Sequence, residues 1–242
     1  MGLLRQEIMH GRKFFLIVYF SSNFALVGAD VSTAIRDALE HFIENKEISG
    51  AVTLVARDGE IVSLQATGLS DLSTGRMMEK NDLFRIASMT KPMAGVAIMM
   101  LVEEGKLNVD DLVEDHLAEF KNQWMIDERS KDTLTLKRSS RKITIFDLLT
   151  HTAGVSNVEI TGFTDGMSWG LAFQVVKEPQ GVTSMLSPGT FGHGGAYGTQ
   201  SWADPVNQTI YILMIQRRGF LPNGDDSIVR KAFQQAAFDS LK

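Results

Sequence analysis

Near the start of the chain, apolar residues recur at helical spacing behind a serine that can cap a helix. Ser32 is that serine, and the residues predicted to face inward are Ile35, Leu39, Phe42 and Ile43. Two β-rich runs follow, residues 51–56 and 60–67, with Asp58-Gly59 between them. A D-G pair between such runs is a strong hairpin signal, so the pattern predicts a helix followed by a hairpin.

The middle of the chain predicts a helix of a different kind. In the helix that opens at Ser88, nearly every face is apolar up to Val102, which is typical of a buried helix, and Gly105 is placed to end it. Residues 106–143 are charged and turn-rich, and they predict a solvated segment that is mostly loop. Thr144 and Asp147 then have the spacing of a capping box, which predicts a short helix.

From Gly170 onward the pattern changes to strands. The β-rich runs are residues 170–176, 189–205 and 207–216. Residues 225–241 then predict a capped amphipathic helix, whose inward residues are Val229, Ala232, Phe233 and Ala236. A helix and hairpin first, helices next, and strands with a helix last predict an α+β fold: an antiparallel sheet flanked by helices.

The composition restricts the class of protein without identifying it. Apolar residues make up 44% of the 242 residues and charged residues 22%, as in a globular protein that buries a core. The net charge of −5, with no basic block that carries aromatics, argues against a nucleic-acid partner. There is no cysteine, and the five histidines form neither H-x-H nor H-E-x-x-H, so we expect no metal and no cofactor.

The N-terminus has the layout of an export signal. A basic start at Arg12-Lys13 precedes an apolar stretch, residues 14–27, and small residues end at Ala29. A stretch of about 14 residues is too short to span a bilayer comfortably. We therefore expect residues 1–29 to be a cleaved export signal of a periplasmic or secreted protein. The alternatives are a membrane anchor through residues 14–27 and a buried strand.

Residues 166–170 read GMSWG, which matches the nucleophile elbow G-x-S-x-G letter for letter. In such an elbow the serine ends a strand and begins a helix, and an acidic residue and then a histidine follow along the chain. The residues after Ser168 predict a strand instead, and no histidine follows Asp204. We interpret Ser168 as a bystander, flanked by turn glycines at the start of a strand.

Ser88 has surroundings that suit a nucleophile better. It lies at the N-terminus of the apolar helix, where backbone N–H groups and the helix dipole favour negative charge. Lys91 follows three residues later, so the two side chains share a helical face. In a partly buried site a lysine loses its proton readily and can accept that of the serine. By itself S-x-x-K is a weak pattern, which also fits a helix cap followed by a surface lysine.

Three motifs in order resemble those of the serine β-lactamase and penicillin-binding-protein superfamily, most closely its class C-like branch, which includes esterases and D-amino-acid peptidases. The motifs are FRIASMTKP (84–92), DLLTHTAG (147–154) and HGGAYGT followed by WADP (193–205). The resemblance covers roughly residues 31–155 and 166–242 and implies the fold of that family.

The resemblance also implies roles for individual residues. Ser88 would be the acylated nucleophile and Lys91 its proton acceptor, and the N–H groups of Ser88 and Ala196 would form the oxyanion hole. In place of the family's K-T-G, the substrate-binding residues would be His193, Gly194 and Gly195. Geometry supports the last point, because glycines on an edge strand let a substrate carbonyl approach the backbone.

One motif of the family is missing. In the class C-like branch this motif is Tyr-x-Asn. It lies on a helical subdomain, between S-x-x-K and K-T-G along the chain, and its tyrosine shares proton transfer with the lysine. The tyrosines here are Tyr19, Tyr197 and Tyr211, and none begins Y-x-N. We therefore expect residues 30–242 to form one β-lactamase-like domain, shortened between about 155 and 166, with a truncated helical subdomain. Val155-Ser156-Asn157 is a faint remnant at best, and Tyr197 could supply a phenol only if it points into the cleft.

Several functional hypotheses stay open. The first is a serine hydrolase that forms an acyl-enzyme on Ser88 with a small ester, amide or β-lactam substrate, weakly active because a proton-transfer group is lost. The second is a catalytically impaired binding module of the same fold, and the third is an incomplete gene product. An α/β-hydrolase that uses Ser168 comes last. His151, in the H-T-A-G turn, is interpreted as structural, with its ring hydrogen-bonded to local backbone.

Overall fold

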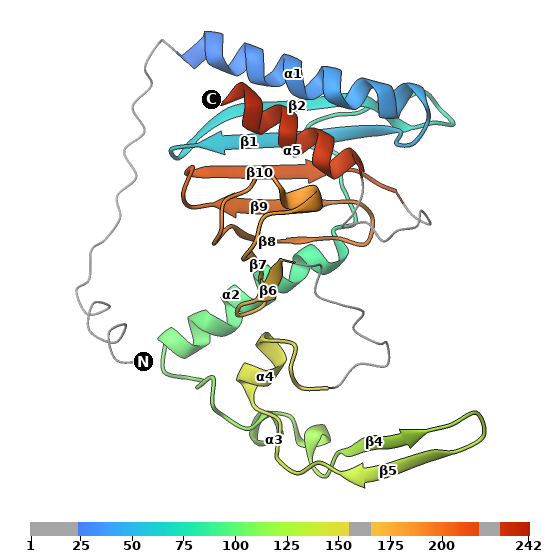
Figure 1. Ribbon diagram of the computed structural model, residues 1–242, viewed down its shortest axis with the longest axis vertical. Coiled ribbons are helices and arrows are strands. Elements are labelled where there is room, and N and C mark those ends of the chain that lie inside the picture. Colours follow the sequence, from blue (N-terminus) through green and yellow to red (C-terminus); the bar gives the residue numbers. More distant parts are fainter. Residues whose placement is uncertain (1–23, 155–165, 218–227) are drawn as a thin grey trace.

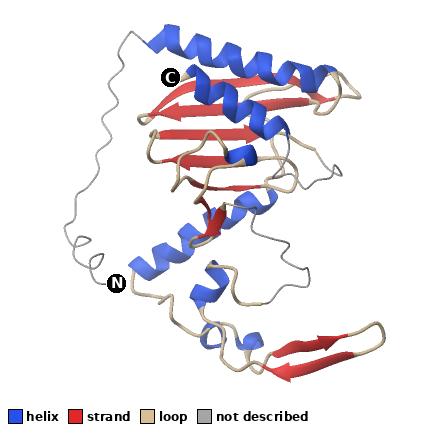
Figure 2. Cartoon of the chain, viewed as in Figure 1, coloured by secondary structure: helices blue, strands red, loops and turns tan. Residues whose placement is uncertain are grey.

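The protein has an α+β fold built on an antiparallel sheet, as the sequence predicts (Figure 1 and Figure 2). The computed structural model describes residues 24–154, 166–217 and 228–242. Within these ranges an 8-stranded sheet has the order β3-β2-β1-β10-β9-β8-β7-β6. Its strands are β1 (Gly50–Arg57), β2 (Glu60–Asp71), β3 (Arg76–Met77), β6 (Met167–Trp169), β7 (Gln174–Val176), β8 (Phe191–Gly194), β9 (Gln200–Asp204) and β10 (Thr209–Met214).

Helices and one separate hairpin make up the rest of the regular structure in the described ranges. The α-helices are α1 (Phe24–Glu44), α2 (Thr90–Glu103), α3 (Val113–His116), α4 (Ile145–Leu149) and α5 (Ile228–Ser240). The short 3₁₀ helices are η1 (Ala87–Met89), η2 (Ala118–Phe120) and η3 (Gly181–Thr183). The separate hairpin consists of β4 (Trp124–Arg129) and β5 (Leu134–Arg138).

The predicted hairpin forms from β1 and β2. Asp58 (φ 53°) and Gly59 (φ 81°) both have the positive φ that a two-residue type I′ turn requires. On its other edge β1 pairs with β10, so that Val52 lies opposite Met214. The centre of the sheet therefore joins segments from opposite ends of the chain.

Helices α1 and α5 lie together over one side of the sheet and bury the main apolar core (Figure 1). Of the residues predicted to face inward, those that are buried are Ile35, Leu39, Phe42, Val229 and Phe233. The predicted start of α1 at Ser32 is wrong, because the helix begins at Phe24. Ser32 lies inside it, and its hydroxyl is 2.8 Å from the hydroxyl of Ser63 on β2, a partner that makes a serine within a helix tolerable.

The prediction that α2 is buried on every side is wrong. Gly95 is its buried residue, and the exposed apolar side chains include Met93 (59%), Val96 (49%) and Met100 (55%). Ile98 and Met99, on another side of α2, pack in a second, smaller core that also contains Leu149. Periodicity reports how apolar a face is and not which segment covers it, so the sequence could not reveal this exposure.

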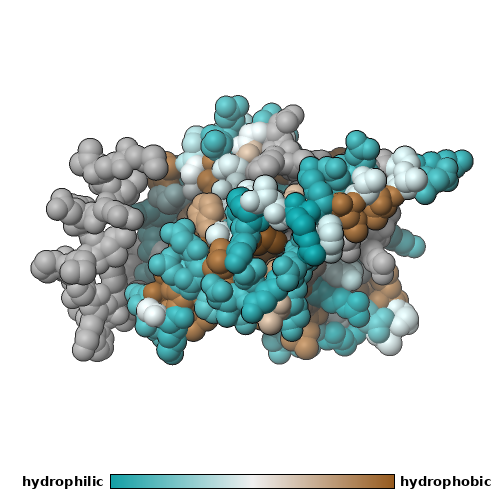
Figure 3. Space-filling view, turned by 90° about the horizontal axis from the view of Figure 1, so that it is seen from below, coloured by the Kyte–Doolittle hydropathy of each residue, from teal (hydrophilic) through white to brown (hydrophobic). Residues whose placement is uncertain are grey.

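The prediction that residues 106–143 are mostly loop is only partly right, because β4 and β5 form a hairpin there that extends away from the sheet (Figure 1). About half of each apolar side chain on it is exposed: Trp124, Met125, Ile126, Leu134 and Leu136. The view from below shows hydrophobic patches between hydrophilic ones on this side of the molecule (Figure 3). Charged residues are frequent in this segment, so its pattern of apolar and polar residues did not predict the two strands. The predicted capping box of Thr144 and Asp147 at the start of α4 is confirmed.

The strand predicted over residues 170–176 is confirmed only over its last three residues, which form β7 and pair with β6 in a small hairpin. Its turn is held against other elements: the Ala172 N–H donates to the Leu149 carbonyl (2.7 Å), and Ala172 packs against Gly95. A Cβ on Gly95 would lie 2.5 Å from the Cβ of Ala172, so α2 approaches this turn closely only because residue 95 is glycine.

The predicted export signal falls mostly outside the described residues, which begin at Phe24. Its last part, residues 24–29, belongs to α1. Val155-Ser156-Asn157 and the predicted cap of the last helix also lie outside the described ranges. No helix in those ranges is both long enough and apolar enough to cross a membrane.

Candidate active site

Ser88 and Lys91 meet where η1 runs into α2. Lys91 Nζ donates a hydrogen bond to Ser88 Oγ over 2.7 Å. The i, i+3 spacing that the sequence shows is what produces this contact. Both side chains are partly exposed, so that a small molecule can reach them. A hydroxyl with an amine at this distance is the arrangement of an activated nucleophile.

The backbone immediately before Ser88 is strained. Ala87 has φ 45°, in the region that favours glycine, which costs an alanine about 1 kcal/mol or more. Contacts on both sides hold the turn in place, because the Ile86 carbonyl accepts from the Met89 N–H (3.1 Å) and from Thr199 Oγ1 (3.4 Å). Strain that the surroundings maintain is frequent at functional turns, and this one presents the Ser88 hydroxyl.

The turn after β8 lies directly against this nucleophile turn. A Cβ on Gly195 would lie 2.3 Å from the Ile86 carbonyl oxygen and 2.2 Å from Thr199 Oγ1. Only glycine therefore allows the two backbones to come so close. Gly194 and Gly195 are buried, whereas Ala196 is exposed at the tip of the turn. The structure thus places the H-G-G-A segment beside the turn that carries Ser88.

A row of three aromatic rings connects β8 with the H-T-A-G turn. His193, 5% exposed, has its ring centroid 5.4 Å from that of Trp169, which lies 4.0 Å from that of His151. His193 Nδ1 also lies 2.5 Å from the Gly194 carbonyl oxygen. Trp169 was not singled out from the sequence, although it belongs to the GMSWG pattern that drew attention to Ser168. The sequence feature that could have indicated Trp169 is a large aromatic residue at the end of a short β-rich run.

The expectation for the ring of His151 is wrong. This residue has φ 59°, and its ring packs on Trp169 instead of forming a hydrogen bond to the described local backbone. Burial lowers the pKa of His151, and the positive charge of Lys91 lowers the pKa further. The imidazole is therefore uncharged at neutral pH and lies close enough to Lys91 to feel its charge.

Neither Ser168 nor Tyr197 joins the Ser88–Lys91 pair. Ser168 lies in the middle of β6 opposite Val175, and no helix follows it as an elbow would require. The ring of Tyr197 lies 5.9 Å from the guanidinium carbon of Arg85, and it forms no hydrogen bond to the pair within the described ranges.

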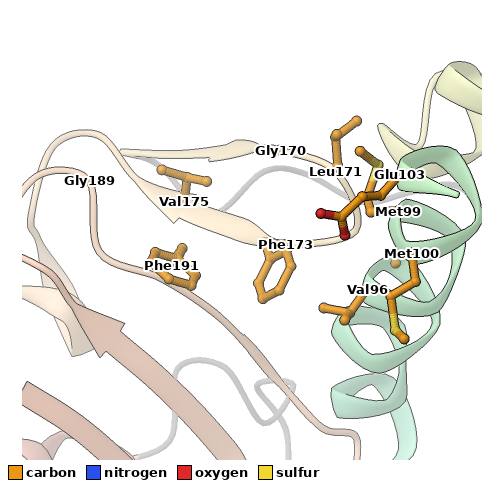
Figure 4. A pocket seen from close by; sticks show the side chains of 11 residues that line it. Val96, Met99, Met100, Glu103, Gly170, Leu171, Phe173, Val175, Gly189 and Phe191 are labelled. Atoms are coloured by element: carbon orange, nitrogen blue, oxygen red, sulfur yellow. The ribbon is translucent and has the colours of Figure 1, made fainter. Parts of the chain in front are cut away.

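A pocket of about 580 Å³ lies along α2, beyond Gly95 (Figure 4). Its walls come from α2, from the β6–β7 hairpin and from residues 189–191, and the apolar side chains are Val96, Met99, Met100, Leu171, Phe173, Val175 and Phe191. The Glu103 carboxylate is directed from α2 toward the β6–β7 turn (Figure 4). Neither Ser88 nor Lys91 lines this pocket, so it is separate from the Ser88–Lys91 pair.

Arg230 is a second residue near the candidate site that the sequence did not predict. It is 1% exposed, lies on α5, and donates hydrogen bonds to the carbonyls of Gly195 (2.8 Å) and Thr199 (2.7 Å). The available signal was an arginine next to Val229 in a helix predicted to bury one side. Within the described ranges, no group of three or more histidine, aspartate or glutamate side chains could hold a metal ion.

Comparisons with known sequences relate this chain to hydrolases. The Beta-lactamase family model matches residues 35–162. "Esterase EstB" from Burkholderia gladioli is 36% identical over 132 residues, which make up 54% of this chain and 31% of that protein. "Protein flp" from Staphylococcus aureus is 29% identical over 126 residues, 52% of this chain and 23% of that protein. The matched region thus spans about a third or less of these relatives.

Solved structures share the fold. EstCE1, described as a hydrolase with promiscuous acyltransferase activity, gives a TM-score of 0.70 at 14% identity, covering 88% of this chain and 100% of that chain. A class C β-lactamase gives a TM-score of 0.59 at 10% identity, covering 90% of this chain and 99% of that chain. At such identities the likeness concerns the fold alone.

Proposed function

Because the chain belongs to the Beta-lactamase family, we propose that it is a serine hydrolase that forms an acyl-enzyme on Ser88. The observation that carries the proposal is the 2.7 Å hydrogen bond between Lys91 Nζ and Ser88 Oγ. The related proteins named above include an esterase, a β-lactamase and a hydrolase with acyltransferase activity, all of which are consistent with transfer of an acyl group to a nucleophile.

In the proposed reaction Lys91 is the proton acceptor for Ser88. Ser88 Oγ attacks the carbonyl carbon of the substrate while its proton passes to Lys91. The carbonyl oxygen becomes an oxyanion, which the N–H groups of Ser88 and Ala196 stabilise. The predicted substrate-binding residues His193, Gly194 and Gly195 are buried, and β8, which carries the first two, lies between β7 and β9 and not at an edge of the sheet, so their part is to carry Ala196 beside the substrate. The bond to the leaving group then breaks, and Lys91 returns the proton to that group. Water repeats the sequence on the acyl-enzyme, which releases the acid and restores Ser88.

The substrate class that we propose is a carboxylic ester, ahead of an amide or a β-lactam. An alcohol leaves more easily than an amine, which must be protonated as it departs. The family's Tyr-x-Asn, which shares that proton work, is absent from this sequence. The name of the relative at 36% identity, an esterase, agrees with this order.

The second candidate is a binding module that has kept the fold and lost most of its catalytic activity. The third is an incomplete gene product without any function. The exposed apolar side chains of α2 and of the β4–β5 hairpin favour the binding module, because large exposed apolar surfaces often mark interaction sites. The shortening between residues 155 and 166 and the missing Tyr-x-Asn would account for the lost activity.

We further propose that the protein is exported through residues 1–29. Cleavage after Ala29 would remove the first part of α1 and leave Val31, Ile35 and Leu39, which are buried in the main core. N-terminal sequencing of the protein secreted by an expressing cell tests this. A mature start near Asp30 supports export, and an intact Met1 contradicts cleavage.

Adduct mapping tests the central proposal. The purified protein is treated with a fluorophosphonate and with a penicillin, and the labelled peptide is identified by mass spectrometry. We expect a label on Ser88 that disappears in Ser88→Ala and remains in the matched control Ser168→Ala. A label on Ser168 would overturn the assignment. A protein that melts cooperatively but takes no label favours the binding module, and one without a cooperative melt favours the incomplete gene product.

A further inference from the structure

The turn that carries Ala196 is attached to a buried guanidinium. Arg230, on α5, donates to the carbonyl oxygens of Gly195 (2.8 Å), Gly198 (3.2 Å) and Thr199 (2.7 Å). These carbonyls lie at the two ends of one short turn. Taking an arginine out of water is unfavourable, and charge-assisted hydrogen bonds offset that cost only when their geometry is good. Arg230 is therefore well placed to fix the shape of this turn.

The Gly195 carbonyl matters most, because it belongs to the same peptide group as the Ala196 N–H. In a trans peptide the C=O and N–H bonds point in opposite directions within one plane. Holding the Gly195 oxygen from the α5 side therefore aims the Ala196 N–H away from α5. A positive charge beside the oxygen also polarises the peptide, which makes its N–H a stronger donor.

Other hydrogen bonds stiffen the same turn. The Gly195 carbonyl also accepts from the Gly198 N–H (3.0 Å), and the Gly195 N–H donates to the Thr199 carbonyl (2.7 Å). On its other side the turn is in contact with η1, because residue 195 has no side chain to separate it from Ile86. The peptide of Gly195 and Ala196 is thus held between Arg230 and the turn that carries Ser88.

We propose that Arg230 is a positioning residue for the oxyanion hole: it orients and polarises the Gly195–Ala196 peptide so that the Ala196 N–H donates to the developing oxyanion. This inference rests on the proposed acyl-enzyme mechanism. It adds that the donor strength of the site depends on α5, a helix that supplies none of the groups assigned to the reaction.

Kinetics of Arg230→Lys test the proposal, since lysine keeps the charge but lacks the rigid planar guanidinium that bonds the three carbonyls here. Removing one oxyanion donor typically costs about 10²–10³ in kcat, and we expect about 10–100-fold here because the donor is displaced and not lost. KM for a p-nitrophenyl ester should change by less than about threefold, since the effect arises in the transition state.

A thionoester of the same acid separates positioning from general damage. Its sulfur is a poorer acceptor than oxygen, so its reaction gains less from the oxyanion hole. The ratio of the ester rate to the thionoester rate should therefore fall in Arg230→Lys. The matched control is Gln234→Met on the same buried side of α5, because the Gln234 amide contacts Gln200, Trp202 and the Val182 carbonyl and makes no hydrogen bond to the turn. It should lower the melting temperature and leave the ratio unchanged. An equal loss on both substrates in Arg230→Lys would overturn the proposal.

A second measurement does not depend on activity. In protein labelled with ¹⁵N-alanine, Arg230→Lys should move the amide proton resonance of Ala196 upfield and leave that of Ala203, on β9, in place. An unmoved Ala196 resonance in a folded variant contradicts the inference. If the wild-type protein hydrolyses no ester but this resonance moves, the proposed function fails while the orientation of the peptide by Arg230 stands.

Discussion

At the scale of single residues, the absence of a side chain decides how the candidate site is assembled. Gly195 lets the β8–β9 turn touch the backbone of Ile86, two residues before the nucleophile. Ala87, between them, tolerates a positive φ that most residues avoid. The turn that carries Ser88 and the turn that carries Ala196 are therefore brought together by backbone packing.

Substituting Gly195 by alanine tests this packing. The added Cβ would lie 2.3 Å from the Ile86 oxygen, so the turn must move away from η1. We expect the rate of fluorophosphonate labelling at Ser88 to fall by roughly 10²-fold, as when an oxyanion donor is lost. Gly170→Ala is the control, because its Cβ would meet Val175 at an ordinary 3.5 Å, and its labelling rate should stay within about twofold of wild type. Wild-type labelling in Gly195→Ala would mean that the turn takes no part in acylation.

At the scale of elements, α4 shows how a few local contacts hold the H-T-A-G turn in place. Asp147 is 5% exposed, accepts from the Thr144 N–H (2.9 Å) and from Arg141 Nη2 (2.9 Å), and closes the capping box. The Thr152 N–H donates to the Asp147 carbonyl (2.9 Å). This hydrogen bond ties the turn that contains His151 to the end of α4. The helix is short, so its cap carries a large share of its stability.

The substitution Asp147→Asn should lower the free energy of unfolding by about 1–2 kcal/mol at pH 7, because the capping box is weakened and the charged pair with Arg141 is lost. The Arg141 guanidinium and the Thr144 donors hold the pKa of Asp147 well below its ordinary value. The carboxylate therefore stabilises the fold above about pH 4 and loses this contribution as the pH falls toward the folded-state pKa. Urea titrations at pH 7 and pH 3 should show the difference from wild type shrinking. Asp132→Asn, an exposed position, should behave like wild type at both values, and a constant difference for Asp147→Asn would contradict the assignment.

At the scale of the whole molecule, the described residues form two apolar cores. The main core lies between the sheet and helices α1 and α5, and the smaller one involves α2, α4 and the turn of the β6–β7 hairpin. The Ser88–Lys91 pair lies where these parts meet, because the turn after β8 contacts η1 and the β6–β7 turn contacts α2. The surroundings of the Ser88–Lys91 pair therefore depend on both cores being folded.

Two truncations test the separation of the cores. Leu39→Ala in the main core and Leu149→Ala in the smaller one remove side chains that are 1% and 7% exposed. Each should lower the free energy of unfolding, by about 2–5 kcal/mol for Leu39→Ala and less for Leu149→Ala, where neighbours can relax. The double variant should equal the sum within about 0.5 kcal/mol, because the sites share no contacts. A coupling energy above about 1 kcal/mol, measured by denaturant titration, would show that the two cores act as one.

Features that depend on neighbours in the sequence were predictable. The Asp58-Gly59 hairpin, the capping box of α4 and the meeting of Ser88 with Lys91 all follow from spacings of four residues or fewer. The exposure of α2 and the hairpin in residues 124–138 were not, because burial depends on segments that pack from far along the chain. The contacts of Arg230 could not be predicted from local spacing, because its partners are about 30 residues away in the chain. They are also backbone carbonyls, which every residue has, so no residue type indicates them.

The position of β10 between β1 and β9 determines when the site can exist during synthesis. Ser88 and Lys91 leave the ribosome early and adjoin each other in one helical turn, but β10 must be made before the sheet can close on β1. The Ala196 turn and Arg230 also come from the last part of the chain. Pairings of such long sequence separation form slowly and late. If the proposed mechanism holds, a nascent chain carries Ser88 without the Ala196 donor, and we expect reactivity toward acyl compounds only after α5 has docked.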